Sequence, residues 1–324
     1  MLYPFTFQPI FKERVWGGRK LKWLFDKPLP SRLRIGESWE ISDRPGEVSV
    51  IANGPLAGKD LHWLVTHYAK ELLGTTKLHN GRFPLLIKIL DARQKLSLQV
   101  HPPSKIAKKW GGEAKTELWY VADAAPAAEL FVGLKRGMSR KKFEALLEKG
   151  SVSDGVHRVR VKRGDAMFLP SGRVHAIGAG LVLFEIQQNS DTTYRVFDWN
   201  RLGLDGKPRQ LHPAESMASI DFKDFEPALV RRHNEERNRS RVLVQHPLFT
   251  ARVVRTQTRN SMVLTENKLH IIGLIEGRVT MESPTGSLKL KKGQFCLIPC
   301  SIKVNVQLAA GSSFILIQPG RVKV

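Results

Sequence analysis

The sequence predicts a mainly β protein made of two similar β-barrel units with a small helical portion. Most segments alternate apolar and polar residues over short runs that end at Gly, Pro, Asn or Asp, and one hairpin pattern occurs twice. The chain has 324 residues, enough for about two domains if each takes roughly 150 residues. We expect a larger first domain over residues 1–240 and a second barrel over residues 241–324.

The expected strands follow the alternating runs, which include residues 96–101, 156–161, 262–275 and 303–306. In such runs successive side chains project to opposite faces, so that one face can be buried. Helix signals are fewer.

Two segments carry helix signals. Asp60 can cap a helix near residues 60–73, whose apolar residues fall on one face before Gly74 ends it. Ser139 begins a second helical stretch, near residues 139–149. These two short helices account for the expected helical portion.

The duplicated pattern is RVRVKRGDAMFLPSGRVH at 158–175, which aligns without a gap on SLKLKKGQFCLIPCSIKV at 287–304. Each copy reads as a strand, a Lys-x-Gly turn, a second strand and a proline turn, and this indicates two similar barrels, although any two hairpins with Gly and Pro turns share part of the pattern. The polar run at 231–241 is the natural boundary between them. Because the first copy ends in His175 and the second in Val304, we expect a polar site in the first barrel only and a second barrel without metal.

Charge is the unusual feature of the composition. The chain has 52 Lys and Arg against 30 Asp and Glu, a net charge of +22, which favours anionic partners. The basic residues are scattered, however, and their runs lack the interleaved aromatic residues of a base-stacking surface. We therefore expect a solvated basic surface and no nucleic-acid partner.

Composition also bears on the compartment. No apolar run approaches the roughly 18 residues of a membrane span, and the first residues lack a signal-peptide pattern. The two cysteines, Cys296 and Cys300, are too few for a disulfide framework. These features predict a cytoplasmic protein with no membrane partner; the oligomeric state stays open, and a monomer is compatible with the sequence.

A group of polar residues predicts a metal site in the first barrel. Alternation in 96–101 projects Ser97, Gln99 and His101 to one face and the three apolar residues to the other. Glu117 supplies a carboxylate, and His175 supplies a second imidazole after the proline turn. Two imidazoles, a carboxylate and an amide oxygen can bind a divalent metal with positions left open for substrate. Each residue alone is more often structural, so only the joint pattern carries this prediction.

The sequence resembles a known family at several motifs. The turn at 164–175 is similar to the second signature of the cupin superfamily. Runs similar to type I phosphomannose isomerases, and most of all to their short bacterial form, are VWGG (15–18), IGESWEIS (35–42), LSLQVHP (96–102), KTELWYV (115–121), SGRVHAIG (171–178) and YRVFDWNR (194–201). The resemblance runs from about Trp16 to Arg201, and residues 242–324 fit the family's C-terminal barrel more loosely.

This resemblance implies two cupin-like (jelly-roll) barrels and a metal-dependent aldose-ketose isomerase. Such an enzyme interconverts mannose 6-phosphate and fructose 6-phosphate through a cis-enediol. The implied ligands of one Zn²⁺ per chain, for which other divalent metals can substitute, are Gln99, His101, Glu117 and His175.

The resemblance also implies roles for other residues. Arg195 falls at the catalytic arginine, and Glu185 matches an acidic residue and is the preferred base, with metal-bound water or a lysine as alternatives. Arg201 falls where many relatives carry a basic residue that can meet the substrate phosphate. The remaining positions implied to contact substrate are Trp16, Lys88, Ser97 and Lys115.

Two other functions stay open on the sequence. A metal-dependent cupin oxygenase would use similar ligands with iron, but it has no evident use for the pair of Arg195 and Arg201. A non-catalytic sugar-phosphate-binding cupin would keep the pocket without turnover, and such proteins commonly carry an appended effector unit that the sequence does not show.

Overall fold

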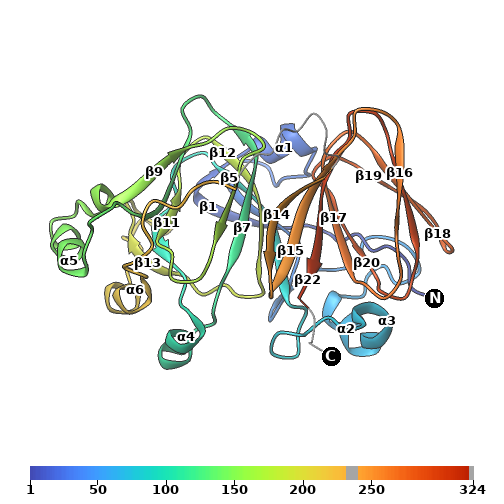
Figure 1. Cartoon of the computed structure of the whole chain (residues 1–324), viewed down its shortest axis with the longest axis horizontal. Helices are drawn as coiled ribbons and strands as arrows, with labels where there is room; N and C mark the ends of the chain where they lie inside the picture. The colour runs from blue at the N-terminus through green and yellow to red at the C-terminus, as the bar shows by residue number, and fades with distance from the viewer. Residues whose placement is uncertain (231–239, 321–324) are drawn as a thin grey trace.

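The computed structural model describes residues 1–230 and 240–320 and shows two β-barrels side by side, each formed by two antiparallel sheets (Figure 1). In spatial order, the larger sheet of the first barrel contains β1 (Ile10–Gly18), β2 (Ile35–Ile41), β5 (Leu85–Ala92), β12 (Leu181–Gln188), β7 (Glu117–Ala124) and β10 (Ala166–Leu169). Its smaller sheet contains β13 (Tyr194–Phe197), β6 (Leu98–Val100), β11 (His175–Ile177), β8 (Glu129–Leu134) and β9 (Val156–Arg160). A short hairpin pairs β3 (Asp43–Arg44) with β4 (Glu47–Val48).

The second barrel has the same plan. One sheet contains β14 (Ser240–His246), β15 (Phe249–Arg255), β22 (Ser313–Pro319), β17 (His270–Glu276) and β20 (Phe295–Ile298). The other contains β16 (Asn260–Leu264), β21 (Val304–Leu308), β18 (Val279–Ser283) and β19 (Gly286–Leu290).

The two barrels share one topology. In the first barrel β5, β12, β7 and β10 are neighbours in one sheet, and β6, β11, β8 and β9 are neighbours in the other. The second barrel repeats both orders with β15 to β22 in place of β5 to β12. This is the two-sheet, eight-stranded jelly roll, so the prediction of two cupin-like barrels is confirmed.

The duplicated sequence forms the same element in both barrels. In each copy the chain passes from a strand of one sheet to a strand of the other through a turn whose glycine has a positive φ, 87° at Gly164 and 77° at Gly293. The backbone N–H of Lys162 donates to the Asp165 carboxylate at 2.8 Å, and Lys291 donates to the side chain of Gln294 at 2.8 Å. The matching turn chemistry explains why the pattern is visible in the sequence.

The helices are short and lie outside the barrels (Figure 1). They are α1 (Lys20–Phe25), α2 (Leu61–His67), α3 (Ala69–Leu73), α4 (Ser104–Trp110), α5 (Arg140–Glu148), α6 (Pro213–Ser219) and a 3-10 turn at Val152–Gly155. In the described ranges, no helix is long and apolar enough to cross a membrane.

Both predicted helical stretches are confirmed, with one difference. Asp60 caps α2 by accepting a hydrogen bond from Trp63 N at 2.7 Å, and Ser139 caps α5 from Lys142 N at 3.3 Å. The stretch at 60–73 is divided into α2 and α3 because Tyr68, with φ of −132°, leaves the helical region. The sequence pattern does not indicate α1, α4 or α6, which have too few turns to show periodicity.

The N-terminal residues link the two barrels. Phe5 exchanges two backbone hydrogen bonds of 2.8 Å with Leu297 of β20, so the start of the chain extends a sheet of the second barrel. Cys300 N donates to Leu72 O at 3.0 Å, which joins α3 to the same barrel. Of the polar run predicted as a boundary, residues 231–239 lie outside the described residues, and β14 begins at Ser240.

Candidate active site

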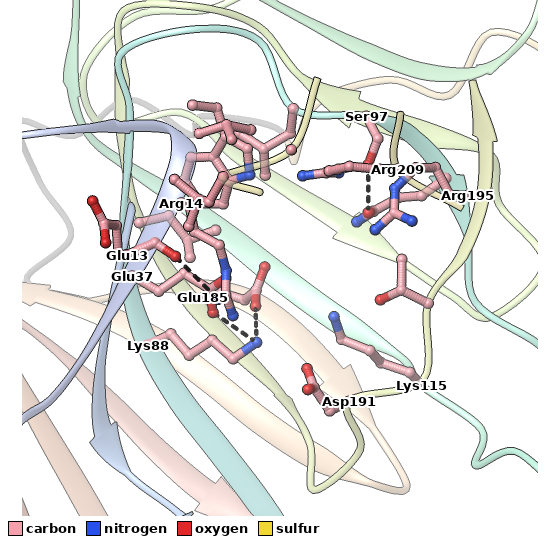
Figure 2. Close-up of a pocket in the computed structure, with 18 of the residues that line it drawn as sticks. Glu13, Arg14, Glu37, Lys88, Ser97, Lys115, Glu185, Asp191, Arg195 and Arg209 are labelled. Carbon is pink, nitrogen blue, oxygen red and sulfur yellow. Dashed lines mark hydrogen bonds and ion pairs between the residues drawn. The ribbon is translucent and has the colours of Figure 1, made fainter. Parts of the chain in front are cut away.

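The first barrel contains a cavity of about 560 Å³ between its two sheets (Figure 2). Residues predicted from the sequence that line this cavity are Trp16, Lys88, Ser97, Gln99, Lys115, Glu185 and Arg195. The equivalent interior of the second barrel is mostly apolar: Val304, which aligns with His175, is fully buried in a hydrophobic cluster with Ile298 and Phe314. At the position equivalent to Glu117 it has His270, whose Nδ1 lies 3.2 Å from the side chain of Gln318. The polar groups are therefore concentrated in one barrel.

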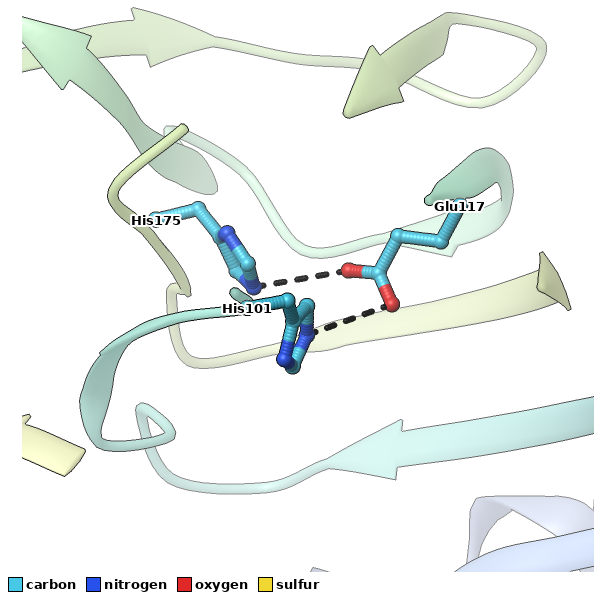
Figure 3. A group of neighbouring side chains, drawn as sticks. All are labelled: His101, Glu117 and His175. Atoms are coloured by element: carbon cyan, nitrogen blue, oxygen red, sulfur yellow. Dashed lines mark ion pairs between the residues drawn. The ribbon is translucent and has the colours of Figure 1, made fainter. Parts of the chain in front are cut away.

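His101, Glu117 and His175 form a buried cluster beside the cavity, and it could hold a metal ion because their ligand atoms all lie within 4.8 Å of one another (Figure 3). Glu117 Oε1 lies 3.4 Å from His175 Nε2, and Glu117 Oε2 lies 3.5 Å from His101 Nε2. All three side chains are at most 2% exposed. A bound cation would draw these ligand atoms of His101, Glu117 and His175 together around itself.

Backbone carbonyls orient both imidazoles. His101 Nδ1 lies 2.9 Å from the carbonyl oxygen of Thr192, and His175 Nδ1 lies 2.9 Å from that of Arg173. Because a carbonyl only accepts, each Nδ1 carries the proton and each Nε2 presents a lone pair to Glu117. Burial lowers the pKa of both histidines, that of His101 to about 3, so both are neutral at pH 7 as ligands must be.

Gln99 and Lys115 complete the surroundings of this cluster. In the smaller sheet Gln99 pairs with His175 on one side and with Arg195 on the other, and its amide nitrogen lies 3.2 Å from His175 Nε2. Rotation of the amide by 180° places its oxygen at that position. Lys115 Nζ lies 2.9 Å from Glu117 Oε2. Burial alone would raise the pKa of Glu117, but Lys115 and the histidines hold it well below its usual range.

A buried lysine stands between two carboxylates on the larger sheet. Lys88 Nζ lies 3.4 Å from Glu185 Oε1 and 3.5 Å from Glu37 Oε2, because β5 pairs with β12 on one side and with β2 on the other. Both carboxylates raise the pKa of Lys88 against the opposing effect of burial, so this side chain remains cationic.

The two carboxylates differ in proton affinity. Arg14 Nε and Trp39 Nε1 each donate to Glu37 at 2.7 Å, and Lys88 with these donors overcomes burial and lowers the pKa of Glu37 to about 2. Glu185 accepts only one described hydrogen bond, from Trp119 Nε1 at 2.8 Å, and burial together with the charge of Glu117 raises its pKa. Two carboxylates whose pKa values are pushed apart are suited to different roles in acid–base chemistry.

The structure places Arg209 at the cavity and Arg201 elsewhere. Arg209 lies beside Ser97 at the cavity (Figure 2), and its Nη2 donates to Ser97 Oγ at 3.3 Å. Its Nε lies 2.9 Å from Asp198 Oδ2. Arg201 donates to Asp198 Oδ1 and to the carbonyl oxygen of Lys95, both at 2.6 Å, and is not among the described residues that line the cavity. No motif points to Arg209, because it follows an irregular loop rich in Gly and charged residues.

Sequence analysis also missed Arg14, Glu37 and Asp191, which line the cavity. Glu37 lies within the run IGESWEIS, so a motif covered it without marking its role. The expected direction of Leu96 is wrong: it lines the cavity because it precedes β6 and does not follow the alternation of that strand. The site therefore combines a candidate metal centre, a carboxylate of raised pKa and several cations.

Comparisons with known proteins agree on one family. Residues 5–144 match the family described as phosphomannose isomerase type I, catalytic domain. The chain is 37% identical over 302 residues to the mannose-6-phosphate isomerase ManA of Bacillus subtilis, an alignment that covers 91% of this chain and 93% of that protein. It is 35% identical over 310 residues to the mannose-6-phosphate isomerase of Streptococcus mutans, with 94% of each covered. The crystal structure of the mannose 6-phosphate isomerase from Bacillus subtilis superposes with a TM-score of 0.88 at 31% identity, covering 98% of this chain and 99% of that one.

Proposed function

Because the chain belongs to the type I phosphomannose isomerases, we propose that the cavity of the first barrel is where it interconverts mannose 6-phosphate and fructose 6-phosphate. The observation that carries this assignment is that the candidate metal cluster lies beside a cavity whose lining includes a carboxylate of raised pKa and five arginine or lysine side chains. After ring opening, the reaction moves a proton between C2 and C1 of the sugar through a cis-enediol. It therefore needs a base, a group that stabilises the enediolate and an anchor for the phosphate.

Glu185 is the proposed base. Its pKa is raised, which makes it a better proton acceptor than an ordinary carboxylate. Trp119 holds Oε2 at 2.8 Å, so Oε1 is the oxygen that takes the proton from C2 and returns it to C1. Lys88, 3.4 Å from Oε1, keeps the carboxylate from rotating away and stabilises its ionised form.

Arg195 and Arg209 are proposed to act on different parts of the substrate. Arg195 borders the cavity next to Gln99 and remains cationic, so it can stabilise negative charge on the enediolate but is a poor proton acceptor. Arg209 and Ser97 offer adjacent donors for the phosphate dianion, which binds best to two or more fixed donors. Trp16, 3% exposed, forms an apolar wall, and Lys115 orients Glu117.

The residues present fit a divalent metal, which we propose to be zinc. His101 Nε2 has no hydrogen-bond partner among the described residues although it is buried, which is costly unless a ligand occupies it. His101, Glu117, His175 and the amide oxygen of Gln99 would hold the ion, which when bound supplies positive charge that polarises the sugar carbonyl.

The arrangement of the chain supports three further assignments. We place the catalytic domain at residues 1–240 and a metal-free barrel at 241–324, supported by the repeated topology and by the apolar surroundings of Val304. We place the protein in the cytoplasm, supported by two free, buried cysteines, Cys296 and Cys300.

The metal site has its own test, which is the metal content of the His101→Ala/His175→Ala double variant. If this variant retained full metal content, the metal would bind elsewhere in the protein.

The test follows mannose 6-phosphate conversion by NMR for Glu185→Gln and for Glu13→Gln, a control carboxylate that lines the same cavity. We expect kcat to fall about 10²-fold or more in the first variant, because the base is lost, and to change less than about 3-fold in the second. A Glu185→Gln variant with normal turnover would refute the assignment of the base. Oxygen uptake by iron-loaded protein is measured in parallel, and substantial uptake would favour the oxygenase alternative.

A further inference from the structure

We propose that a second cavity on the first barrel, separate from the catalytic one, binds a small, multiply charged phosphate compound. This outer cavity has a volume of about 600 Å³. Its lining includes four cations and two aromatic rings, Arg93, Lys95, Arg158, Arg201, Phe131 and Trp199. Among its described lining residues Glu129 is the single acid, so the cavity carries excess positive charge.

Aromatic rings hold two of the cations at the outer cavity. Lys95 Nζ lies 3.7 Å from the ring centroid of Trp199, and the Arg158 guanidinium lies 5.0 Å from that of Phe131. The two ring centroids are 5.5 Å apart. Since each cation is attracted to a ring face, both are partly ordered before any ligand arrives.

The backbone at Trp199 and Asn200 makes a sharp bend beside the outer cavity. Trp199 and Asn200 are consecutive non-glycine residues with positive φ, 58° and 54°, a conformation that such residues rarely adopt. Trp199 Nε1 donates to Leu96 O at 2.6 Å, and Arg201 donates to Lys95 O at 2.6 Å. The bend therefore turns the indole of Trp199 and the guanidinium of Arg201 toward the backbone of residues 95 and 96.

The four cations of the outer cavity outnumber the two carboxylates near them, Glu129 on the lining and Asp198, which pairs with Arg201. Burial and the nearby charges of Arg158 and Arg201 lower the pKa of Lys95, and Glu129 opposes this effect. Glu129 lies 3.8 Å from Arg158, a long contact for an ion pair. A ligand with two or more negative charges would balance this excess positive charge, and phosphate oxygens match guanidinium and ammonium donors. The size of the cavity fits a small molecule.

One carboxylate connects the outer cavity with the catalytic cavity. Asp198 binds Arg201 through Oδ1 at 2.6 Å and Arg209 through Oδ2 at 2.9 Å, and it is only 5% exposed. An anion that draws Arg201 away leaves Asp198 to hold Arg209 more strongly, so Arg209 is less available to the substrate. This effect on turnover rests on the proposed function, in which Arg209 binds the sugar phosphate, whereas the binding of the anion does not.

The binding test uses inorganic pyrophosphate and isothermal titration calorimetry on the full chain, with the catalytic cavity saturated by fructose 6-phosphate. We expect wild-type protein to bind pyrophosphate and Lys95→Met/Arg158→Gln to bind it at least about 10-fold more weakly. The control Lys108→Met/Arg252→Gln loses the same charge at exposed positions away from the cavity, and we expect binding within about 2-fold of wild type. Equal binding by both double variants would overturn the site. A parallel titration with a nucleoside diphosphate distinguishes a nucleotide ligand, which would bind more tightly, from a free diphosphate.

The kinetic test measures KM for mannose 6-phosphate against pyrophosphate concentration. We expect KM to rise two- to five-fold and then to level off with kcat unchanged, and Lys95→Met/Arg158→Gln to abolish this rise. A KM that climbs without limit in both proteins would mean competition in the catalytic cavity only and would overturn the connection through Asp198. Protein that binds pyrophosphate as expected but does not isomerise sugar phosphate would contradict the proposed function and leave the outer site standing.

Discussion

Replacement of Arg209 by glutamine separates substrate binding from catalysis. Arg209 donates to Ser97 at 3.3 Å inside the cavity, and burial with the neighbouring Arg195 lowers its pKa to about 10, so it is still cationic at pH 7 to 8. A hydrogen bond to a charged group contributes about 1.5 to 3 kcal/mol. At about 1.4 kcal/mol per factor of ten, Arg209→Gln should raise KM for mannose 6-phosphate roughly 10- to 100-fold. We expect kcat within about 3-fold, because the phosphate is bound equally in the ground state and the transition state.

Arg201→Gln is the matched control. Arg201 binds the other oxygen of Asp198 at 2.6 Å but is not among the described residues that line the catalytic cavity. We expect KM to rise no more than about 5-fold, through the shared carboxylate. Steady-state kinetics and thermal melts are measured on both variants, so that loss of folded protein is not mistaken for loss of binding. A large rise in KM for Arg201→Gln with none for Arg209→Gln would refute this reasoning and restore the phosphate role that the family resemblance implies for Arg201.

Three other substitutions test neighbouring parts of the site. Arg195→Lys keeps the charge but loses the two-pronged geometry, so kcat should fall roughly 10²-fold with KM changed only a few-fold; normal kcat in a destabilised protein would indicate a structural role instead. Lys88→Met removes the cation 3.4 Å from Glu185 and should raise the pKa of that carboxyl further, so the fall of kcat/KM on acidification should move to higher pH than in wild type; an unmoved profile would mean that Glu185 is not the titrating base. Asp91 is 1% exposed, and burial raises its pKa from 3.8 to about 6. Ionisation of this carboxyl therefore destabilises the folded state by about 3 kcal/mol above pH 6. The destabilisation disappears as the pH falls toward 4, where the carboxyl is protonated in the folded state. Asp91→Asn should therefore be more stable than wild type at pH 8 and nearly equal at pH 4 by urea unfolding, and equal stability at pH 8 would contradict the raised pKa.

The fold could be predicted because its signals are local and repeated. Alternating polarity marks the strands, and the turn that holds Gly164 recurs with the same hydrogen bond around Gly293. The division between α2 and α3 at Tyr68 could not be predicted, since the apolar face continues across the break. Pairing between Phe5 and Leu297 is equally invisible, because nothing local relates residues so far apart in the chain.

The site was predictable only in part. His101, Glu117 and His175 stand on or beside strands whose motifs are distinctive. The carbonyl that positions His175 belongs to Arg173, two residues earlier, whereas the one that positions His101 belongs to Thr192, far away in the sequence, and could not be predicted. Glu37 acquires its role when β2 pairs with β5 and brings it to Lys88, a register that periodicity does not specify. Arg209 reaches the cavity from an irregular loop, where side-chain direction depends on tertiary contacts and not on a repeating pattern.

Metal-dependent isomerisation in the first barrel is tested by a coupled assay of mannose 6-phosphate turnover on protein whose metal content has been measured. We expect about one divalent ion per chain, formation of fructose 6-phosphate, and loss of both ion and activity in parallel on chelation, with recovery on adding zinc. Full activity after the ion has been removed, or no turnover by the fully metal-loaded protein, would contradict the assignment of a metal-dependent isomerase.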